Sequence, residues 1–204
     1  MILGIDFDNT IVCYDRLFHR LAVEQGLVPA DVPATKADVR DYLRSIDRED
    51  DWTQLQGLAY GDRILEADPF PGVVDALSAC HGAGMQLRIV SHKTRHPYRG
   101  PRYDLHEAAH HWLAHHGLID PDRTGLNCDN VYLELTKADK LHRIAELGCT
   151  HFIDDLPEFL AEPEFPDGVQ PILFDPVGRY TDSFPLTAFR SWFELQQFLA
   201  VTAA

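Results

Sequence analysis

The N-terminal stretch MILGIDFDNTIV, residues 1–12, constrains the fold more than any other part of the chain. An apolar run that only Gly4 interrupts leads directly into two acids, Asp6 and Asp8. A short apolar run without alternation is typical of a strand buried on both faces, such as the central strand of a parallel sheet. Residues two apart on an extended strand point to the same side, unless a turn begins at Asp8. The stretch therefore predicts a central strand that ends in an acidic site.

These two carboxylates favour a metal site at the end of the strand. Carboxylates this close repel each other unless a cation or a proton lies between them, and burial raises that cost. Asn9 is a turn former, and the hydroxyl of Thr10 could hold an anion near the same metal. The alternative is that one acid caps a helix while the other is solvated. A buried strand that runs straight into DFDNT favours the metal site.

Composition limits the size of the fold and the kinds of partner. A chain of 204 residues with 45% hydrophobic content can bury one substantial core and a small accessory domain. The net charge of −14 argues against a nucleic-acid polymer or an anionic membrane as the main partner. Four widely spaced cysteines without a CxxC motif indicate reduced thiols, and no leader or membrane-length apolar run is present. We therefore expect a cytoplasmic protein.

Residues 14–68 are predicted to form a small helical insert. Apolar residues recur with a helical period from Leu17 to Leu27 and again from Val39 to Ile46, where Thr35 is the expected N-cap. A third helix begins near Arg48 and a PFPG turn closes the insert. The predicted domains are a catalytic core of residues 1–13 and 69–204 and a small helical cap of residues 14–68.

The rest of the chain alternates between strands and helices. The pattern predicts strands at 85–91, 131–135, 150–153 and 169–174, and helices at 73–81, 105–116, 137–147 and 186–199. Short strands separated by helices of this length indicate right-handed βαβ units. The predicted fold class is α/β, a Rossmann-like parallel sheet with helices on both faces and a helical cap inserted after the first strand.

Chemically useful side chains follow several of these strands. Ser91 ends the second strand, Lys137 follows the third, and Asp154 and Asp155 follow the fourth. Ligand sites in such sheets lie at the carboxyl ends of the strands. Each residue alone has a plain explanation, as a turn residue, a solvated lysine or a helix cap. Together they supply the groups that hold an oxygen-preferring divalent cation and a phosphate.

In these motifs the chain resembles the haloacid dehalogenase superfamily of phosphohydrolases. The four motifs of that family match DFDNT, IVS, TKADK and FIDD in order, and they cover the chain from Met1 to about Phe174. The insert lies where the family places a type-one cap. The resemblance implies that Asp6 is the nucleophile and Asp8 the general acid and base. It also implies that Thr10 and Ser91 contact phosphate and that Lys137 neutralises charge.

The same resemblance implies a Mg²⁺ site. Asp154 and Asp155 would complete it together with Asp6 and the backbone carbonyl of Asp8, and which of the two later acids contacts the metal directly stays open. The motif lysine is also open, since Lys140 lies one turn after Lys137. We prefer Lys137, because Thr136 is the expected helix cap and keeps Lys137 in the first turn.

The predicted function is a Mg²⁺-dependent phosphomonoesterase that forms an aspartyl-phosphate. An ionised Asp attacks a phosphoryl group well once the charge of that group is neutralised, and positioning and charge stabilisation dominate the chemistry. Family members that cleave carbon–halogen bonds lack the acid found here at Asp8, so the resemblance favours the phosphatase branch. The alternatives are a phosphotransferase, a receiver-type signalling domain with its acids in a different order, and a phosphate-binding protein without catalysis.

The substrate is predicted to be a small phosphorylated metabolite, either a nucleotide or a sugar phosphate. The segment from Ser91 to Tyr103 is locally basic in an acidic chain, and it contains Lys93, Arg95 and Arg99. Because it follows a strand end, we interpret these three residues as a second anion-binding patch. A solvated loop is the alternative. The oligomeric state is not indicated by the sequence.

Overall fold

The computed structural model describes residues 1–180 and 185–202. The chain divides into two compact units. The core unit contains Met1–Ile11, Pro69–Lys93 and His116–Ala204. The insert unit contains Val12–Asp68 and Thr94–His115.

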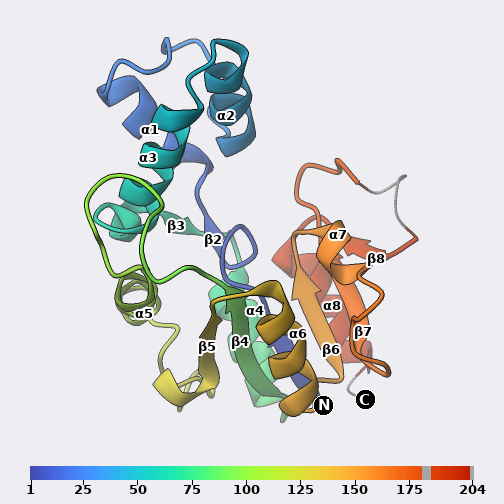
Figure 1. Cartoon of the computed structure of the whole chain (residues 1–204). Coiled ribbons are helices and arrows are strands. Elements are labelled where there is room, and N and C mark those ends of the chain that lie inside the picture. Colours follow the sequence, from blue (N-terminus) through green and yellow to red (C-terminus); the bar gives the residue numbers. More distant parts are fainter. Residues whose placement is uncertain (181–184, 203–204) are drawn as a thin grey trace. The chain divides into compact units, whose positions relative to one another are not determined.

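A parallel sheet of six strands forms the centre of the core unit (Figure 1). The strand order is β5-β4-β1-β6-β7-β8, and every neighbouring pair is parallel. The strands are β1 (Ile2–Ile5), β4 (Gln86–His92), β5 (Val131–Glu134), β6 (His151–Asp154), β7 (Gln170–Phe174) and β8 (Thr187–Phe189). The predicted α/β class with a Rossmann-like parallel sheet is confirmed, and β1 lies inside the sheet, between β4 and β6.

Helices lie on both faces of this sheet, with α6 in front of it and α4 and α8 behind it in Figure 1. The helices of the unit are α4 (Val73–Gly82), η2 (Cys128–Asn130), α6 (Lys137–Glu146), α7 (Pro157–Leu160) and α8 (Trp192–Thr202). Thr136 caps α6, because its hydroxyl accepts a hydrogen bond from the Asp139 backbone N–H at 3.0 Å. Leu141 and Ile144 of α6 are buried in the core.

Gly4 of β1 leaves room for the side chain of Phe152, its partner on the neighbouring strand β6. A β-carbon at this position would lie 2.5 Å from Cδ2 of Phe152 and 3.0 Å from Sγ of Cys149. We expect Gly4→Ala to lower the free energy of unfolding by about 1–3 kcal/mol, because a core this dense must shift to accept the methyl group. The matched control is Gly82→Ala in α4, where a β-carbon has no neighbour within 4 Å. Urea denaturation of both variants measures the difference, and equal midpoints would contradict the close approach.

The insert unit is helical. Its elements are β2 (Val12–Cys13), α1 (Asp15–Glu24), α2 (Lys36–Ser45), α3 (Glu49–Tyr60), η1 (Ile64–Glu66) and α5 (Leu105–His115). A two-residue strand, β3 (Asp68–Pro69), pairs with β2. The core of this unit is aromatic. The ring centroids of Phe18 and Trp52 are 4.9 Å apart, and those of Tyr14 and Tyr60 are also 4.9 Å apart. Thr35 caps α2 as expected, since its hydroxyl accepts from the Asp38 N–H at 3.0 Å.

The compact units divide the chain differently from the predicted domains at one segment. Residues 94–115, including α5, belong to the insert unit, although the predicted core of residues 69–204 included them. Trp112 of α5 is buried and donates its indole N–H to the carbonyl of Ala67 at 2.8 Å, and a β-carbon on Gly57 would lie 2.8 Å from Cβ of Pro97. Strand–helix alternation places a helix in the sequence but not on a particular surface.

The predicted helix at 186–199 is wrong in its first part. Residues 187–189 form β8, which pairs in parallel with β7. The helix α8 begins at Trp192, after Ser191, whose hydroxyl accepts from the Glu194 N–H at 3.2 Å. Thr187 is β-branched and Phe189 is aromatic, and both residue types are common in strands. Pairing with β7 stabilises residues 187–189 as a strand in place of the predicted helix.

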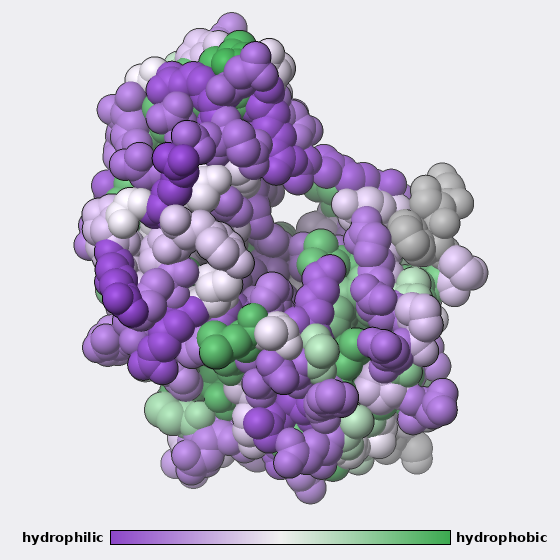
Figure 2. All heavy atoms as spheres, in the orientation of Figure 1, coloured by the Kyte–Doolittle hydropathy of each residue, from purple (hydrophilic) through white to green (hydrophobic). Residues whose placement is uncertain are grey.

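Figure 2 shows that one face of the molecule is covered mainly by hydrophilic residues, with hydrophobic residues in small groups. This surface agrees with the charge of −14. Within residues 1–180 and 185–202, the structure contains no helix whose length and apolar character would allow it to cross a membrane.

Candidate active site

A tight turn after β1 places the two N-terminal acids at the carboxyl edge of the sheet. The Asp6 N–H donates to the carbonyl of Ile153 at 2.8 Å, which extends the pairing of β1 with β6. The Ile11 N–H donates to the carbonyl of Phe7 at 3.0 Å and closes the turn. Within it Asn9 has a φ of 59°, a left-handed conformation that Asn adopts more easily than most residues.

Asp6 is buried and receives two hydrogen bonds on one carboxylate oxygen. Ser91, near the end of the neighbouring strand β4, donates its hydroxyl to Oδ1 at 2.9 Å. The ammonium of Lys140 donates to the same oxygen at 2.7 Å. Both partners come from elements far from Asp6 in sequence, so the parallel sheet assembles this contact.

Lys140 also joins Asp6 to Asp154. Its Nζ lies 2.6 Å from Oδ2 of Asp154, while the other oxygen of Asp154 accepts the Leu156 N–H at 2.9 Å. The ammonium lies 4.3 Å from the ring centroid of Phe159, a favourable contact for a cation. Lys140 and Asp154 are buried. A charge network of this kind is stable only because every charge has a close partner.

Burial and charge shift the protonation of this network. Burial raises the pKa of Asp6 to about 6, against the opposing effect of Lys140 and with a further rise from the neighbouring Asp154. Burial opposes the charge of Lys140, but the carboxylates of Asp154 and Asp6 outweigh it and raise the pKa of the lysine above its usual value. Lys140 is therefore a permanent cation, and Asp6 is an acid that changes charge near neutral pH.

Three carboxylates are arranged so that they could hold one metal ion. Asp6, Asp154 and Asp155 each offer an oxygen, and these oxygens lie within 4.8 Å of one another. An all-oxygen anionic set suits Mg²⁺, which prefers hard oxygen ligands and keeps some of its waters. The donor set therefore fits the predicted cofactor, while metal binding itself stays a prediction.

The preference for Lys137 over Lys140 is not supported by the geometry. Both residues line a cavity of about 90 Å³ next to Asp6, but Lys137 is exposed, whereas Lys140 is buried against the acids. Thr136 is indeed the cap, so Lys137 occupies the first position of α6, where its side chain extends toward solvent. Lys140 lies one turn later on the face that packs on the sheet, together with Leu141 and Ile144.

Asp8 lies in the same cavity but has a different cation. Lys93 donates to both of its carboxylate oxygens, at 2.8 Å and 2.7 Å. Lys93 was expected to contact substrate, and neither its pair with Asp8 nor Phe159 in the cavity lining was predicted. The available signal was position, because Lys93 follows β4 directly and β4 neighbours β1.

The predicted roles of three other residues, Thr10, Arg95 and Arg99, stay predictions. Thr10 is completely buried, and its hydroxyl has no hydrogen-bond partner among the described residues. Arg95 and Arg99 belong to the insert unit, where they form ion pairs with Asp104 at 2.9 Å and with Asp50 at 3.0 Å.

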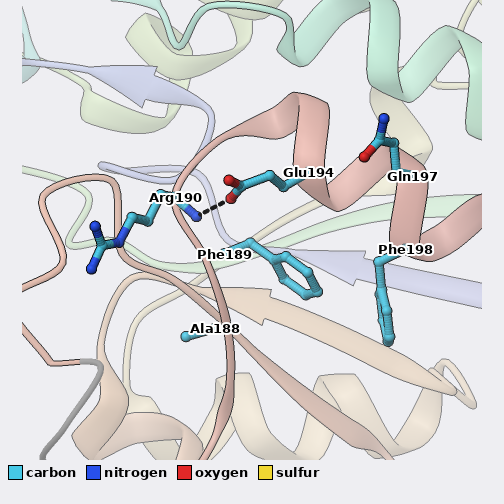
Figure 3. Close-up of a pocket in the computed structure, with 6 residues that line it drawn as sticks. All are labelled: Ala188, Phe189, Arg190, Glu194, Gln197 and Phe198. Atoms are coloured by element: carbon cyan, nitrogen blue, oxygen red, sulfur yellow. Dashed lines mark hydrogen bonds between the residues drawn. The ribbon is translucent and has the colours of Figure 1, made fainter.

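A larger hollow of about 570 Å³ lies elsewhere in the core unit, along β8 and α8 (Figure 3). The rings of Phe189 and Phe198 lie there with centroids 5.0 Å apart and planes tilted by 41°, and the backbone N–H of Arg190 donates to Glu194 at 2.8 Å. None of the clustered acids lines this hollow. The larger hollow is therefore not the best candidate for the reactive site, since three of the acids, the Ser91 hydroxyl and the buried Lys140 line the smaller cavity.

Comparison with known proteins identifies the fold. No protein-family model and no curated protein matches the sequence. A haloacid dehalogenase-like protein of unknown function from Agrobacterium tumefaciens superposes with a TM-score of 0.61 at 16% identity, covering 100% of this chain and 99% of that chain. The chain has the fold of the haloacid dehalogenase (HAD) hydrolases.

Other HAD-fold structures agree. A HAD family hydrolase from Deinococcus radiodurans R1, with bound phosphate and sodium, has a TM-score of 0.60 at 16% identity over 98% of this chain and 95% of that chain. A predicted phosphoglycolate phosphatase from Haemophilus somnus has a TM-score of 0.55 at 13% identity over 97% and 96%. A dehalogenase is also similar, with a TM-score of 0.59 at 14% identity over 98% and 96%. At these sequence identities the comparison establishes only the HAD fold. Evidence for the type of reaction has to come from the residues of the site.

Proposed function

We propose that this chain is a HAD-family phosphomonoesterase that uses Mg²⁺ and forms an aspartyl-phosphate on Asp6. The observation that carries the proposal is the contact of one Asp6 oxygen with Ser91 and Lys140, beside two further carboxylates whose oxygens lie within 4.8 Å. Oriented acids, a hydroxyl and a fixed cation are the groups that phosphoryl transfer needs.

Each residue has a role that follows from its contacts. Ser91 and Lys140 hold the Asp6 carboxylate in one orientation, so that its other oxygen can attack phosphorus. Mg²⁺, held by Asp6, Asp154 and Asp155, would neutralise phosphoryl charge. Asp8 gives a proton to the leaving oxygen and later removes one from water. The exposed Lys137 lines the cavity and can contact the phosphate from its open side.

The proposed substrate is a small phosphorylated metabolite. The cavity beside Asp6 is small and most of the residues that line it are polar or charged, and the similar Deinococcus protein contains a bound phosphate. A dehalogenase activity is less compatible with the residues, because Asp8 supplies a proton donor that halide departure does not need.

A substrate panel tests the proposed function. We expect phosphate monoesters to be hydrolysed in the presence of Mg²⁺, with activity lost in EDTA and restored by added Mg²⁺. Haloacids in the same panel should be inert, and added alcohols should not receive the phosphoryl group. Halide release without phosphate release would overturn the proposal, while phosphoryl transfer to an alcohol would favour the phosphotransferase.

Mg²⁺ affinity should depend on pH through Asp6. The raised pKa of about 6 means that metal-free Asp6 is protonated below this value, and bound metal requires the ionised form. Affinity should therefore fall about tenfold for each pH unit below 6 and level off above it. Calorimetric Mg²⁺ titrations at pH 5, 6, 7 and 8 measure the trend. Asp6→Asn, which cannot ionise, should remove the part of the pH dependence that belongs to Asp6.

The same pKa shift predicts how the stability of the metal-free protein changes. Because the pKa of Asp6 is higher in the folded state than in the unfolded chain, protonated Asp6 favours folding, and this contribution is lost as the pH rises through about 6. Added Mg²⁺ should raise the Tm more at pH 8 than at pH 5. An equal increase at both values would contradict the assignment of Asp6 as a ligand.

A further inference from the structure

We propose that Lys93 is a positioning residue for Asp8 in the second half of the reaction, when water hydrolyses the aspartyl-phosphate. This inference rests on the proposed function and gives Lys93 a role different from the substrate contact expected from the sequence. It would make Lys93 a determinant of kcat and not of substrate affinity.

Lys93 and Asp8 form a close ion pair in which the lysine is shielded from solvent. The ammonium reaches both carboxylate oxygens, at 2.8 Å and 2.7 Å, and the Lys93 side chain is only 3% exposed, against 21% for that of Asp8. The ammonium also lies 5.3 Å from the ring centroid of Phe7. An ammonium that donates to both oxygens restricts the position of the carboxylate more than a single hydrogen bond does.

Lys93 reaches Asp8 from a rigid support. Its backbone N–H donates to the carbonyl of Glu134 at 2.8 Å, which continues the pairing of β4 with β5 beyond the last residue of β4. Asp8, by contrast, lies in the turn after β1, next to the left-handed Asn9. Lys93 therefore holds a group in a turn from the end of a strand.

The two buried lysines serve different acids. Lys140 contacts Asp6 and Asp154, the residues of the proposed nucleophile and metal site, whereas Lys93 contacts Asp8. Both ammonium groups lie against aromatic rings and away from solvent. One lysine therefore orients the proposed nucleophile, and a different lysine orients the proposed acid and base.

The step that depends on this orientation is the attack of water on the aspartyl-phosphate. The water oxygen forms a bond to phosphorus, and the proton of that water passes to a carboxylate oxygen of Asp8. The bond between phosphorus and the Asp6 oxygen breaks, and its electron pair returns to the Asp6 carboxylate as inorganic phosphate leaves. In the next turnover Asp8 gives this proton to the leaving oxygen of a new substrate.

An aryl phosphate isolates this step. A nitrophenolate leaves without a proton donor, so the first half of the reaction needs little from Asp8, whereas hydrolysis of the aspartyl-phosphate needs it fully. In Lys93→Met, we expect kcat for p-nitrophenyl phosphate to fall by about 10²-fold with no rise in KM, because a slightly misplaced base loses about this factor. Stopped-flow measurements should show a burst of nitrophenolate, and acid quenching should trap phosphorylated protein.

A double-mutant cycle tests whether Lys93 acts through Asp8. Asp8→Asn combined with Lys93→Met should be no slower than Asp8→Asn alone, since no carboxylate remains to be positioned. The double variant also removes both members of the ion pair, so neither charge of that pair remains. Lys93→Arg, which can still bind both carboxylate oxygens, should recover part of the kcat lost in Lys93→Met.

The outcomes separate this inference from the proposed function. A raised KM without a burst, or losses that multiply in the double variant, would overturn the positioning role and assign Lys93 to substrate binding. Wild-type protein that hydrolyses no phosphate ester with Mg²⁺ would overturn the proposed function itself.

Discussion

Asp6→Asn should lower kcat for p-nitrophenyl phosphate by at least about 10⁴-fold, because an amide cannot form the phosphorylated intermediate. The amide is the same size as the carboxylate and can still accept hydrogen bonds from Ser91 and Lys140 at Oδ1. The fold should therefore be retained, and the loss of activity can be assigned to chemistry. Steady-state kinetics with Mg²⁺ measure the effect, and circular dichroism verifies the fold.

Asp175→Asn provides a matched control for this variant. Asp175 is also a buried aspartate that follows a strand of the same sheet, but its oxygens accept the backbone N–H groups of Arg179 at 2.9 Å and Tyr180 at 2.8 Å. Its replacement should reduce stability and leave kcat within about tenfold of the wild type. Asp6→Asn with near wild-type activity would exclude Asp6 as the nucleophile.

Among the substitutions proposed here, Lys140→Met should lower the free energy of unfolding the most. The substitution removes the only cation that the described residues place on both Asp6 and Asp154, and leaves two buried carboxylates without it. Breaking a buried ion pair in this way costs about 3–5 kcal/mol. The loss should be smaller at pH 5 than at pH 8, because Asp6 can take up a proton at the lower pH. Urea denaturation at the two pH values measures both effects.

Lys137→Met is the control for this variant, since it makes the same substitution one turn earlier in α6. Lys137 is exposed, so its stability should change by less than about 0.5 kcal/mol. Added Mg²⁺ should recover part of the stability lost in Lys140→Met by neutralising the same carboxylates. A larger loss of stability in Lys137→Met than in Lys140→Met would contradict the ion-pair geometry.

The fold was predictable because its signals are local. A continuous apolar run such as residues 2–5 predicts a strand buried on both faces, and β1 is found between two other strands. Alternating strands and helices predict a parallel sheet, and parallel strands bring their carboxyl ends to one edge. This geometry alone predicts that Asp6, Ser91 and Asp154 come together, and the structure places them within one charge network.

The choice between two lysines was not predictable in the same way. Thr136 caps α6 as expected and favoured Lys137 as the motif lysine, whereas the lysine that contacts Asp6 is Lys140. Which side of α6 faces the sheet depends on how Leu141 and Ile144 pack in the core, and Lys140 is carried inward with them. The unit to which α5 belongs depends on tertiary packing in the same way, because its buried Trp112 donates to Ala67 within the insert unit.

The sequence by itself determined the order of the strands along the chain, the α/β class and the acids that end the strands, because these depend on hydrophobic patterning and on neighbours in the chain. Only the tertiary structure decided the partners of those acids: Lys140 for Asp6 and Asp154, and Lys93 for Asp8. The physical reason is that a buried ammonium is stable only where packing brings carboxylates within hydrogen-bond distance. In the pairs of Asp6 with Lys140 and of Asp8 with Lys93, the two residues are more than 80 positions apart in the sequence, so only folding brings them together.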